Sequence, residues 1–383
     1  MRNTTVISFG LLAVLLAGCT TIPRRTGEEL PPDWEMKPSP APAAKAHTGR
    51  MVPSKRPLPE TTWIPLDQWG RLHDAKSLQR LSETPPTYSL SVNGGVFVVQ
   101  AGSRYAHWDG MEIRLGFAPQ MIGGRVCLHR LDVLKNLDPL TSPFIGSSRA
   151  HPLVVIDPGH GGGNTGTRSV LDGRLEKEFT LDWALRLKPL LERRGWQVLL
   201  TRTNDVNMTL PERVAFAEQH KADLFVSLHF NATGSRGDAS GLETYCLTPT
   251  GMPSNLTREY DDDVTQVYPN NAFDEQNLQY AVRLHRALLA INGNQDRGVC
   301  RARFLGVLRG QNRPAVLIEG GYLSNPTEAR HIEDPAYRQK LAQAVAQALT
   351  ESTPLTNQFS GAGSQSTTLA PTVAGANAGS VTP

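Results

Sequence analysis

The chain has 383 residues, of which 39% are apolar, and its formal net charge at pH 7 is +3. This length is enough for one full-sized domain together with a smaller one. The slight basic excess is spread along the chain without a dense run of lysine and arginine, so we expect no nucleic-acid partner.

The first segment, residues 1–18, has the features of a signal peptide. Arg2 precedes an apolar run, residues 6–17, that is too short to span a membrane as a permanent helix. The sequence LAGC that ends at Cys19 resembles the lipobox of a bacterial lipoprotein, which implies cleavage before Cys19 and a lipid on its sulfur. The resemblance implies a protein of the cell envelope, lipid-anchored in the outer membrane and facing the periplasm. An ordinary secretion signal with a chance cysteine is the alternative.

Two further segments do not have the composition of a folded domain. Residues 19–60 are rich in Pro, Ala and Lys, which is typical of an extended tether. Residues 355–383 contain little charge and few large apolar side chains, so we predict a disordered tail.

Residues 61–145 contain short runs of alternating apolar and polar residues, which predict a small β-rich domain. The sequence Asn93-Gly94-Gly95 between two of these runs is a hairpin signal. The WIPL start and this hairpin resemble the copper-amine-oxidase N-terminal-like module of envelope proteins. We expect its histidines to be ordinary half-buried residues and not metal ligands.

Residues 151–350 have a different pattern, in which near-continuous apolar strands alternate with amphipathic helices. The pattern predicts an α/β fold with a mostly parallel, twisted sheet and helices on both faces. Functional side chains in such sheets lie at the carboxyl ends of the strands.

A glycine-rich loop, residues 161–166, follows the first of these strands and fits the dinucleotide-binding pattern G-x-G-x-x-G. A phosphate site of this kind needs a helix that begins within the loop. Here the helical pattern begins only near Glu176, and no lysine follows the loop, so the sequence disfavours a phosphate site.

Four polar residues lie at strand ends or at the start of a helix, namely His160, Glu176, His229 and Glu319. Two histidines and one carboxylate form the ligand set of a catalytic zinc site, and a further carboxylate can carry protons. Each residue alone also has an ordinary structural explanation. For example, a glutamate at the start of a helix is stabilised by the helix dipole. Glu178 is the alternative to Glu176 as a ligand.

The stretches VVIDPGHGG, LEKEFTLDWALRL, ADLFVSLHFNA and LIEGGYLSN occur in this order. They resemble the four signatures of the zinc-dependent N-acetylmuramoyl-L-alanine amidases of the amidase-3 type, over residues 151–350. The resemblance implies that His160, Glu176 and His229 bind one zinc ion and that Glu319 is the catalytic acid and base. It implies hydrolysis of the amide between N-acetylmuramic acid and L-alanine in peptidoglycan, for cell-wall remodelling or daughter-cell separation.

Two other functions stay open from the sequence. One is a non-catalytic peptidoglycan-binding envelope lipoprotein, which would be marked by loss of a ligand or of the acid. The other is a zinc peptidase that cuts stem-peptide cross-links, although the chain has no H-E-x-x-H helix. Asn231 and Arg297 are candidate substrate contacts, although Asn231 could simply end its strand. Arg213 and Arg297 could meet stem-peptide carboxylates, but solvated surface positions are the default for both.

Three features are left with alternatives. Residues 248–276 form a long polar insert that is either a wall of the substrate groove or a regulatory segment responsive to an activator protein. Cys246 and Cys300 either form a disulfide or are isolated buried thiols. Asp157 either supports a metal ligand or forms a turn before Pro158.

Overall fold

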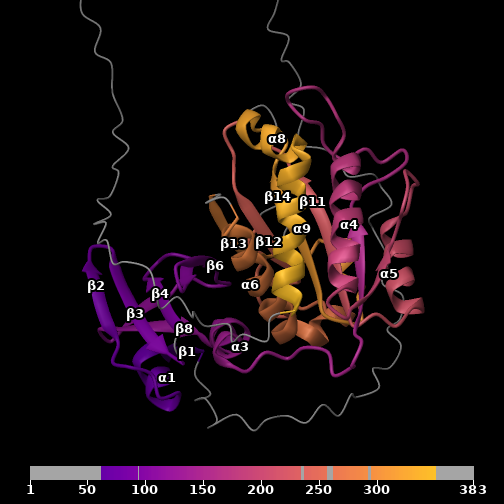
Figure 1. Cartoon of the computed structure of the whole chain (residues 1–383). Helices are drawn as coiled ribbons and strands as arrows, with labels where there is room; N and C mark the ends of the chain where they lie inside the picture. Colours follow the sequence, from indigo (N-terminus) through magenta and orange to yellow (C-terminus); the bar gives the residue numbers. More distant parts are fainter. Residues whose placement is uncertain (1–61, 94, 234–236, 257–261, 292–294, 351–383) are drawn as a thin grey trace, which may run out of the picture. The chain divides into compact units, whose positions relative to one another are not determined.

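The computed structural model describes residues 62–350 except 94, 234–236, 257–261 and 292–294 (Figure 1). The predicted signal peptide, Cys19, the tether and the tail at 355–383 lie outside the described residues. Among the described residues, no helix has both the length and the apolar character needed to cross a membrane.

The first part of the described chain consists mainly of strands. Its elements are β1 (Trp63–Pro65), α1 (Leu66–Leu72), β2 (Gln79–Glu83), β3 (Pro86–Val92), β4 (Gly95–Gln100), β5 (Tyr105–Trp108), β6 (Met111–Arg114), β7 (Gln120–Ile122), β8 (Arg125–His129), α2 (Arg130–Asp132), the π-helix η2 (Val133–Leu137) and α3 (Asp138–Thr141). Strands β3 and β4 pair antiparallel up to Val92↔Gly95. Asn93 between them has a φ of 49°, as the predicted hairpin requires.

The second part alternates strands and helices. Its elements are β9 (Leu153–Pro158), α4 (Glu176–Glu192), β10 (Gln197–Leu200), α5 (Leu210–Gln219), β11 (Leu224–Asn231), β12 (Leu242–Cys246), the 3₁₀ helix η3 (Pro269–Phe273), α6 (Asp274–Leu289), β13 (Asp296–Arg301), α7 (Gly306–Arg309), β14 (Ala315–Tyr322), α8 (Pro326–Glu333) and α9 (Pro335–Thr350).

Among the described residues, eleven of the strands form one mixed sheet in the order β10-β9-β11-β14-β12-β13-β6-β5-β4-β3-β2. The pairs β10–β9, β9–β11, β11–β14, β12–β13 and β13–β6 are parallel. Strand β12 is antiparallel to β14, and the pairs from β6 to β2 are antiparallel. The prediction of a mostly parallel sheet is therefore not confirmed, because an apolar run does not specify the direction of its strand.

Helices pack on both faces of this sheet. Val154 and Ile156 belong to the larger buried cluster, which includes side chains of α4, α6 and α9. Val155 and Phe225 belong to a second buried cluster with side chains of α5 and α7. Since successive residues of a strand point to opposite faces, the two clusters are the two sides of the sheet. Figure 1 shows α4 and α9 side by side over one of these faces.

Of the two alternatives for Cys246 and Cys300, the structure shows no disulfide, since Cys127, Cys246 and Cys300 are all free and buried. Strands β12 and β13 are neighbours, but Cys246 pairs with Arg301 while Cys300 pairs with Tyr245. This offset of one residue places the two thiols on opposite faces of the sheet. The alternative of isolated buried thiols describes the structure.

The insert at 248–276 packs against the β-rich part. Asn255 Nδ2 donates a hydrogen bond to the Leu115 carbonyl at 3.0 Å, and Arg104 donates to the Ser254 carbonyl at 3.0 Å. Within its described residues, η3 is the only helix that lies wholly inside this insert.

The two parts of the described chain are joined at β6 and β13. Ile113 pairs with Val299, and both side chains are buried. Arg301, the last residue of β13, is 1% exposed and donates to the Lys135 carbonyl at 2.5 Å and to Asn136 Oδ1 at 2.9 Å. A buried guanidinium held by partners from the other part makes unfolding of one part costly for the other.

We predict that Arg301→Ala lowers the free energy of unfolding of the full chain by about 3 kcal/mol, because it leaves buried acceptors without a donor. Urea unfolding followed by tryptophan fluorescence measures this, since Trp108 and Trp183 report on the two parts. The control is Arg71→Ala, whose side chain is 66% exposed in its pair with Asp67 and which should cost at most about 1 kcal/mol. Equal losses for the two variants would contradict the role of Arg301.

Candidate metal centre and proton carrier

His160 lies two residues beyond the end of β9, in the loop that joins β9 to α4 and includes the glycine-rich residues 161–166. Its backbone φ is 62°, a left-handed conformation that few residues other than glycine adopt. Its Nδ1 lies 2.8 Å from Asn164 Oδ1 in the same loop. A carboxamide oxygen only accepts hydrogen bonds, so Nδ1 carries the proton and Nε2 is the nitrogen left for a metal.

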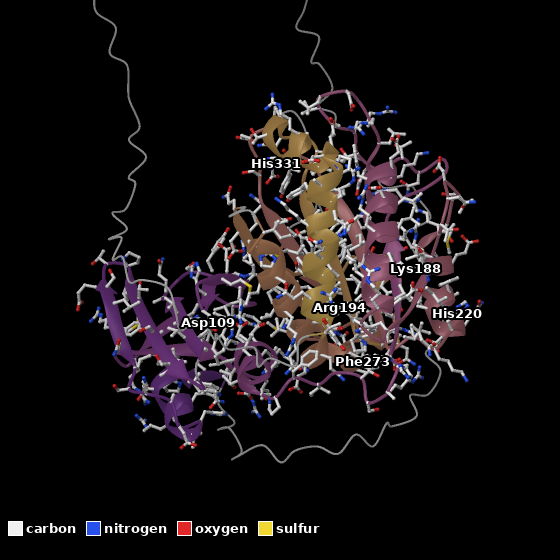
Figure 2. The ribbon with its side chains drawn as sticks, viewed as in Figure 1. Asp109, Lys188, Arg194, His220, Phe273 and His331 are labelled. Atoms are coloured by element: carbon white, nitrogen blue, oxygen red, sulfur yellow. The ribbon has the colours of Figure 1, made fainter. Side chains whose placement is uncertain are left out.

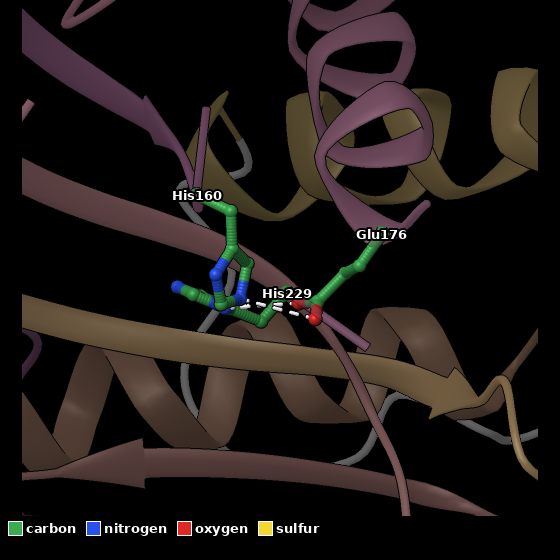
Figure 3. Close-up of side chains that lie close together, drawn as sticks. All are labelled: His160, Glu176 and His229. Carbon is green, nitrogen blue, oxygen red and sulfur yellow. Dashed lines mark hydrogen bonds and ion pairs between the residues drawn. The ribbon is translucent and has the colours of Figure 1, made fainter. Parts of the chain in front are cut away.

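Glu176 is the first residue of α4 and is buried. Its Oε2 lies 3.0 Å from His160 Nε2, and its Oε1 lies 3.1 Å from Nδ1 of His229 on β11 (Figure 3). The backbone N–H groups of Thr167 and Phe230 also donate to this carboxylate. Glu178, the alternative ligand, is exposed.

One potential ligand atom from each of His160, Glu176 and His229 lies within 4.8 Å of the other two. Two imidazole nitrogens and one carboxylate oxygen are a donor set that suits zinc. The structure thus brings together the three residues that the sequence predicts as ligands, and they are able to hold a metal ion.

The charges of these three groups are coupled. Burial opposes a charge on His160, but the Glu176 carboxylate outweighs burial and raises the pKa of the imidazole. Burial alone would raise the pKa of Glu176, but His160 and His229 lower it. Burial lowers the pKa of His229. The cluster therefore presents an ionised carboxylate and, on His229, a nitrogen that stays unprotonated at neutral pH.

At two positions of the loop, neighbouring side chains leave no space for a residue larger than glycine. A Cβ on Gly159 would lie 2.2 Å from Cε1 and 2.5 Å from Nε2 of His229. A Cβ on Gly166 would lie 2.5 Å from Glu176 Oε2. By contrast, Gly163 has open space around the position of a Cβ. The glycines at 159 and 166 therefore make room for the side chains of His229 and Glu176.

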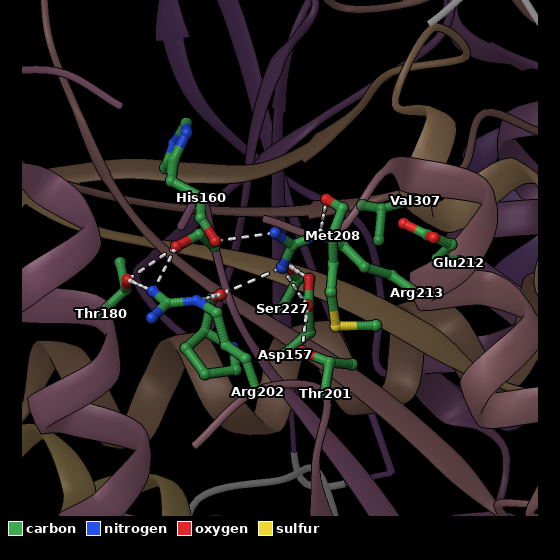
Figure 4. Close-up of polar contacts among 12 residues, drawn as sticks. Asp157, His160, Thr180, Thr201, Arg202, Met208, Glu212, Arg213, Ser227 and Val307 are labelled. Atoms are coloured by element: carbon green, nitrogen blue, oxygen red, sulfur yellow. Dashed lines mark hydrogen bonds and ion pairs between the residues drawn. The ribbon is translucent and has the colours of Figure 1, made fainter. Parts of the chain in front are cut away.

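A buried ion pair lies beneath the loop (Figure 4). Asp157 and Arg213 have side chains 1% and 3% exposed, and their closest atoms are 2.6 Å apart. Burial would raise the pKa of Asp157, but Arg213 and the hydroxyls of Thr201 and Ser227 lower it. Arg213 also donates to the His160 carbonyl at 2.7 Å, so the expectation that Arg213 is a solvated surface residue is wrong.

Arg202 holds the same loop from another direction. It donates to the carbonyls of Pro158 and Gly159 at 3.0 and 2.8 Å and to that of Lys177 at 2.8 Å. It thus links the end of β9 to the first turn of α4, which carries Glu176. The sequence analysis did not single out Arg202. Its position directly after an apolar strand is the signal that could have identified it.

Glu319 lies on β14, directly opposite His229 of β11 in the parallel register. Its Oε2 atom is buried and has no hydrogen-bond partner among the described residues. Burial, and then the carboxylates of Glu176 and Glu243, raise the pKa of Glu319 well above its usual range. A buried carboxyl group that holds its proton and has an oxygen without a partner among the described residues is suited to exchange a proton with a bound molecule.

The two candidate substrate contacts share one partner. Asn231 Nδ2 donates to Glu243 Oε2 at 3.0 Å, and Arg297 Nε donates to Glu243 Oε1 at 2.6 Å. Glu243 is a buried residue of β12 that the sequence analysis missed. Its signal in the sequence is a lone acidic residue inside the apolar run GLETYC.

The chain is also similar to known proteins. The family described as N-acetylmuramoyl-L-alanine amidase matches residues 154–351. The chain is similar to the amidase LytC of Bacillus subtilis, at 33% identity over 211 residues that cover 55% of this chain and 36% of LytC. It is similar to the amidase AmiA of Escherichia coli, at 28% identity over 237 residues that cover 56% of this chain and 81% of AmiA. Thus the chain spans only about a third of the length of LytC.

Among solved structures, the chain is similar to the catalytic domain of the N-acetylmuramoyl-L-alanine amidase CwlV from Paenibacillus polymyxa. The identity is 31%, the TM-score is 0.43, and the match covers 52% of this chain and 96% of the CwlV domain.

We predict that Gly159→Ala weakens metal binding about tenfold or more, because the added methyl group displaces the ring of His229. Competition with a chromophoric chelator for zinc measures the affinity, and circular dichroism checks that the variant is folded. The matched control is Gly163→Ala in the same loop, which should bind zinc like the wild type. Wild-type affinity in Gly159→Ala would show that the ring of His229 is not a ligand.

Proposed function

We propose that this chain, which belongs to the N-acetylmuramoyl-L-alanine amidase family, is a zinc-dependent enzyme that hydrolyses the amide between N-acetylmuramic acid and L-alanine in peptidoglycan. One observation carries the proposal. The His160–Glu176–His229 cluster and Glu319 come from segments far apart in the sequence, yet the β11–β14 register sets Glu319 directly beside His229.

His160, Glu176 and His229 are the residues that would hold the zinc ion. When bound, zinc supplies Lewis-acid activation of a water molecule and of the amide carbonyl. The residues fit this role, since the cluster combines an ionised carboxylate with imidazole nitrogens. The buried Oε2 of Glu319, on the strand next to His229, has no hydrogen-bond partner among the described residues, which leaves it available to a bound molecule.

Glu319 would act as the base and then as the acid. Burial and the charge of Glu176 raise the pKa of Glu319. Positive charge at the His–Glu cluster would oppose both effects, so that Glu319 could ionise and accept a proton from the attacking water. The protonated carboxyl group then donates to the amide nitrogen that leaves. The proton is returned within one turnover, and the products are the muramic acid carboxylate and a free L-alanyl amine.

The remaining parts of the proposal concern the setting of the enzyme. We propose that Cys19 carries a lipid and that the 19–60 tether holds the enzyme at the outer membrane, facing periplasmic peptidoglycan. Asn231 and Arg297 are proposed to contact the substrate, and a role in cell-wall remodelling or daughter-cell separation follows from the bond that is cut. An activator protein is a further proposed partner.

The products of digestion distinguish this function from the two alternatives. The zinc-loaded full chain is incubated with purified sacculi, and the released fragments are identified by mass spectrometry. Free stem peptides that begin with L-alanine support an amidase. Cut cross-links with intact muramoyl amides would indicate a peptidase, and intact sacculi would indicate a binding protein.

We predict that Glu319→Gln lowers kcat at least about a hundredfold, because the amide cannot carry the proton. Zinc content, measured by elemental analysis, should stay near that of the wild type, since Glu319 is not a proposed ligand. Peptide release from sacculi at the wild-type rate would show that Glu319 is not the proton carrier.

We also predict that His229→Ala reduces the bound zinc to near zero after dialysis, and that a chelator abolishes peptide release by the wild type. The control is His220→Ala, an exposed histidine directly after α5 that is not one of the three ligand candidates and is labelled in Figure 2. It should keep full zinc content. Full zinc in His229→Ala would contradict the proposed ligand set.

A further inference from the structure

We propose that Arg297 binds a carboxylate of the leaving peptide, one or two residues beyond the cleaved amide, and that Glu243 is the positioning residue that holds Arg297 there. The inference rests on the proposed function. It adds that the leaving peptide must carry a carboxylate and that this peptide extends from Glu319 towards Arg297.

Four side chains form a row along one end of the sheet. Strand β11 pairs with β14 at His229↔Glu319, and β14 pairs with β12 at Glu319↔Glu243. Residues directly opposite each other on neighbouring strands point to the same face. Arg297 of β13 extends the row through its bond to Glu243. The row leads from a metal-ligand candidate, through the proton carrier, to a guanidinium group.

Arg297 is held on two sides and accessible on a third. Its Nε donates to Glu243 at 2.6 Å, and its guanidinium carbon lies 5.1 Å from the ring centroid of Tyr322. The side chain is 31% exposed, whereas that of Glu243 is 6% exposed. Because the bond to Glu243 uses Nε, the two terminal nitrogens remain for a ligand. This parallel pair of donors matches the two oxygens of a carboxylate.

Glu243 is fixed by more donors than a simple ion pair needs. The hydroxyl groups of Tyr245 and Tyr322 donate to it at 2.6 and 3.0 Å, in addition to Asn231 and Arg297. Both carboxylate oxygens therefore have fixed partners. A buried ion pair adds little net stability, because removing both charges from water costs free energy. The four donors to Glu243 are therefore better explained by the position in which Glu243 holds Arg297.

The spacing agrees with a peptide that extends along the row. Neighbouring strands lie about 4.8 Å apart, so Arg297, two strands from Glu319, is about 10 Å from it along the sheet. An extended peptide covers about 3.5 Å per residue, and the side chain of arginine reaches several ångströms. The amine that receives the proton of Glu319 belongs to the leaving peptide, so this peptide lies on the Glu319 side of the metal ligands.

The test uses two muramoyl-L-alanyl peptide probes that differ in one group. The second peptide residue carries either a free α-carboxylate or the corresponding primary amide. With the zinc-loaded full chain, we expect kcat/KM to be about tenfold or more higher for the carboxylate probe, mainly through KM. Arg297→Gln should cut both probes equally, and Arg297→Lys should keep part of the preference, because it keeps the charge without the paired donors.

The matched control is Arg80→Gln. Arg80 of β2 forms a similar pair, 2.6 Å from Glu83 and with its guanidinium carbon 5.8 Å from the ring centroid of Tyr88. This variant should keep the wild-type preference. The preference is a ratio within one protein sample, so a partial loss of folded enzyme does not change it.

Two results would overturn the assignment of Arg297 while leaving the amidase activity intact. These are equal kcat/KM for both probes with the wild type, and an unchanged preference in Arg297→Gln. If the wild type leaves the muramoyl amide of both probes uncut, the proposed function itself fails, and the proposal for Arg297 fails with it.

Discussion

The buried pair of Asp157 and Arg213 is the interaction on which the rest of the site depends. Two charges with almost no exposure are tolerated only where the surrounding groups satisfy them. Here the hydroxyls of Thr201 and Ser227 bind the carboxylate, and backbone carbonyls of the loop bind the guanidinium. The loop cannot move without breaking these bonds, so the left-handed backbone of His160 is held in place.

The same pair connects three strands to the loop. Asp157 is the last but one residue of β9, Ser227 lies on β11 and Thr201 follows β10. The carboxyl ends of these parallel strands meet at one edge of the sheet, which is where an open sheet places its ligands. Arg202 then ties the loop to the start of α4. The position of Glu176 relative to the two histidines thus follows from bonds to the backbone beneath the site.

Much of this arrangement is predictable from the sequence, and the exceptions have physical causes. His160, His229 and Glu319 follow or end apolar runs, so strand ends predict their meeting. The burial of Arg213 was predicted wrongly, and Glu243 was not identified at all. A charged residue is usually solvated, and only tertiary contacts show that it is buried.

Long-range pairing was harder to predict than the site. The antiparallel direction of β12 and the junction of β6 with β13 depend on contacts between residues far apart in sequence. Periodicity reports only which face of a strand is apolar. The sequence predicted a small β-rich domain before the larger one, and it gave no sign that strands β2 to β6 would continue the same sheet.

The residues of the site lie far apart along the chain, so they are synthesised at different times. The three ligand candidates lie between residues 160 and 229, whereas Glu319 lies on β14, the last strand of the sheet. The chain is synthesised from its N-terminal end, so the segment with the three ligand candidates is made before β14, which lies between β11 and β12. Domains generally fold as units, so the sheet closes only after this central strand is available. Under the proposed function, a chain without β14 would lack the proton carrier, and hydrolysis would require the complete sheet.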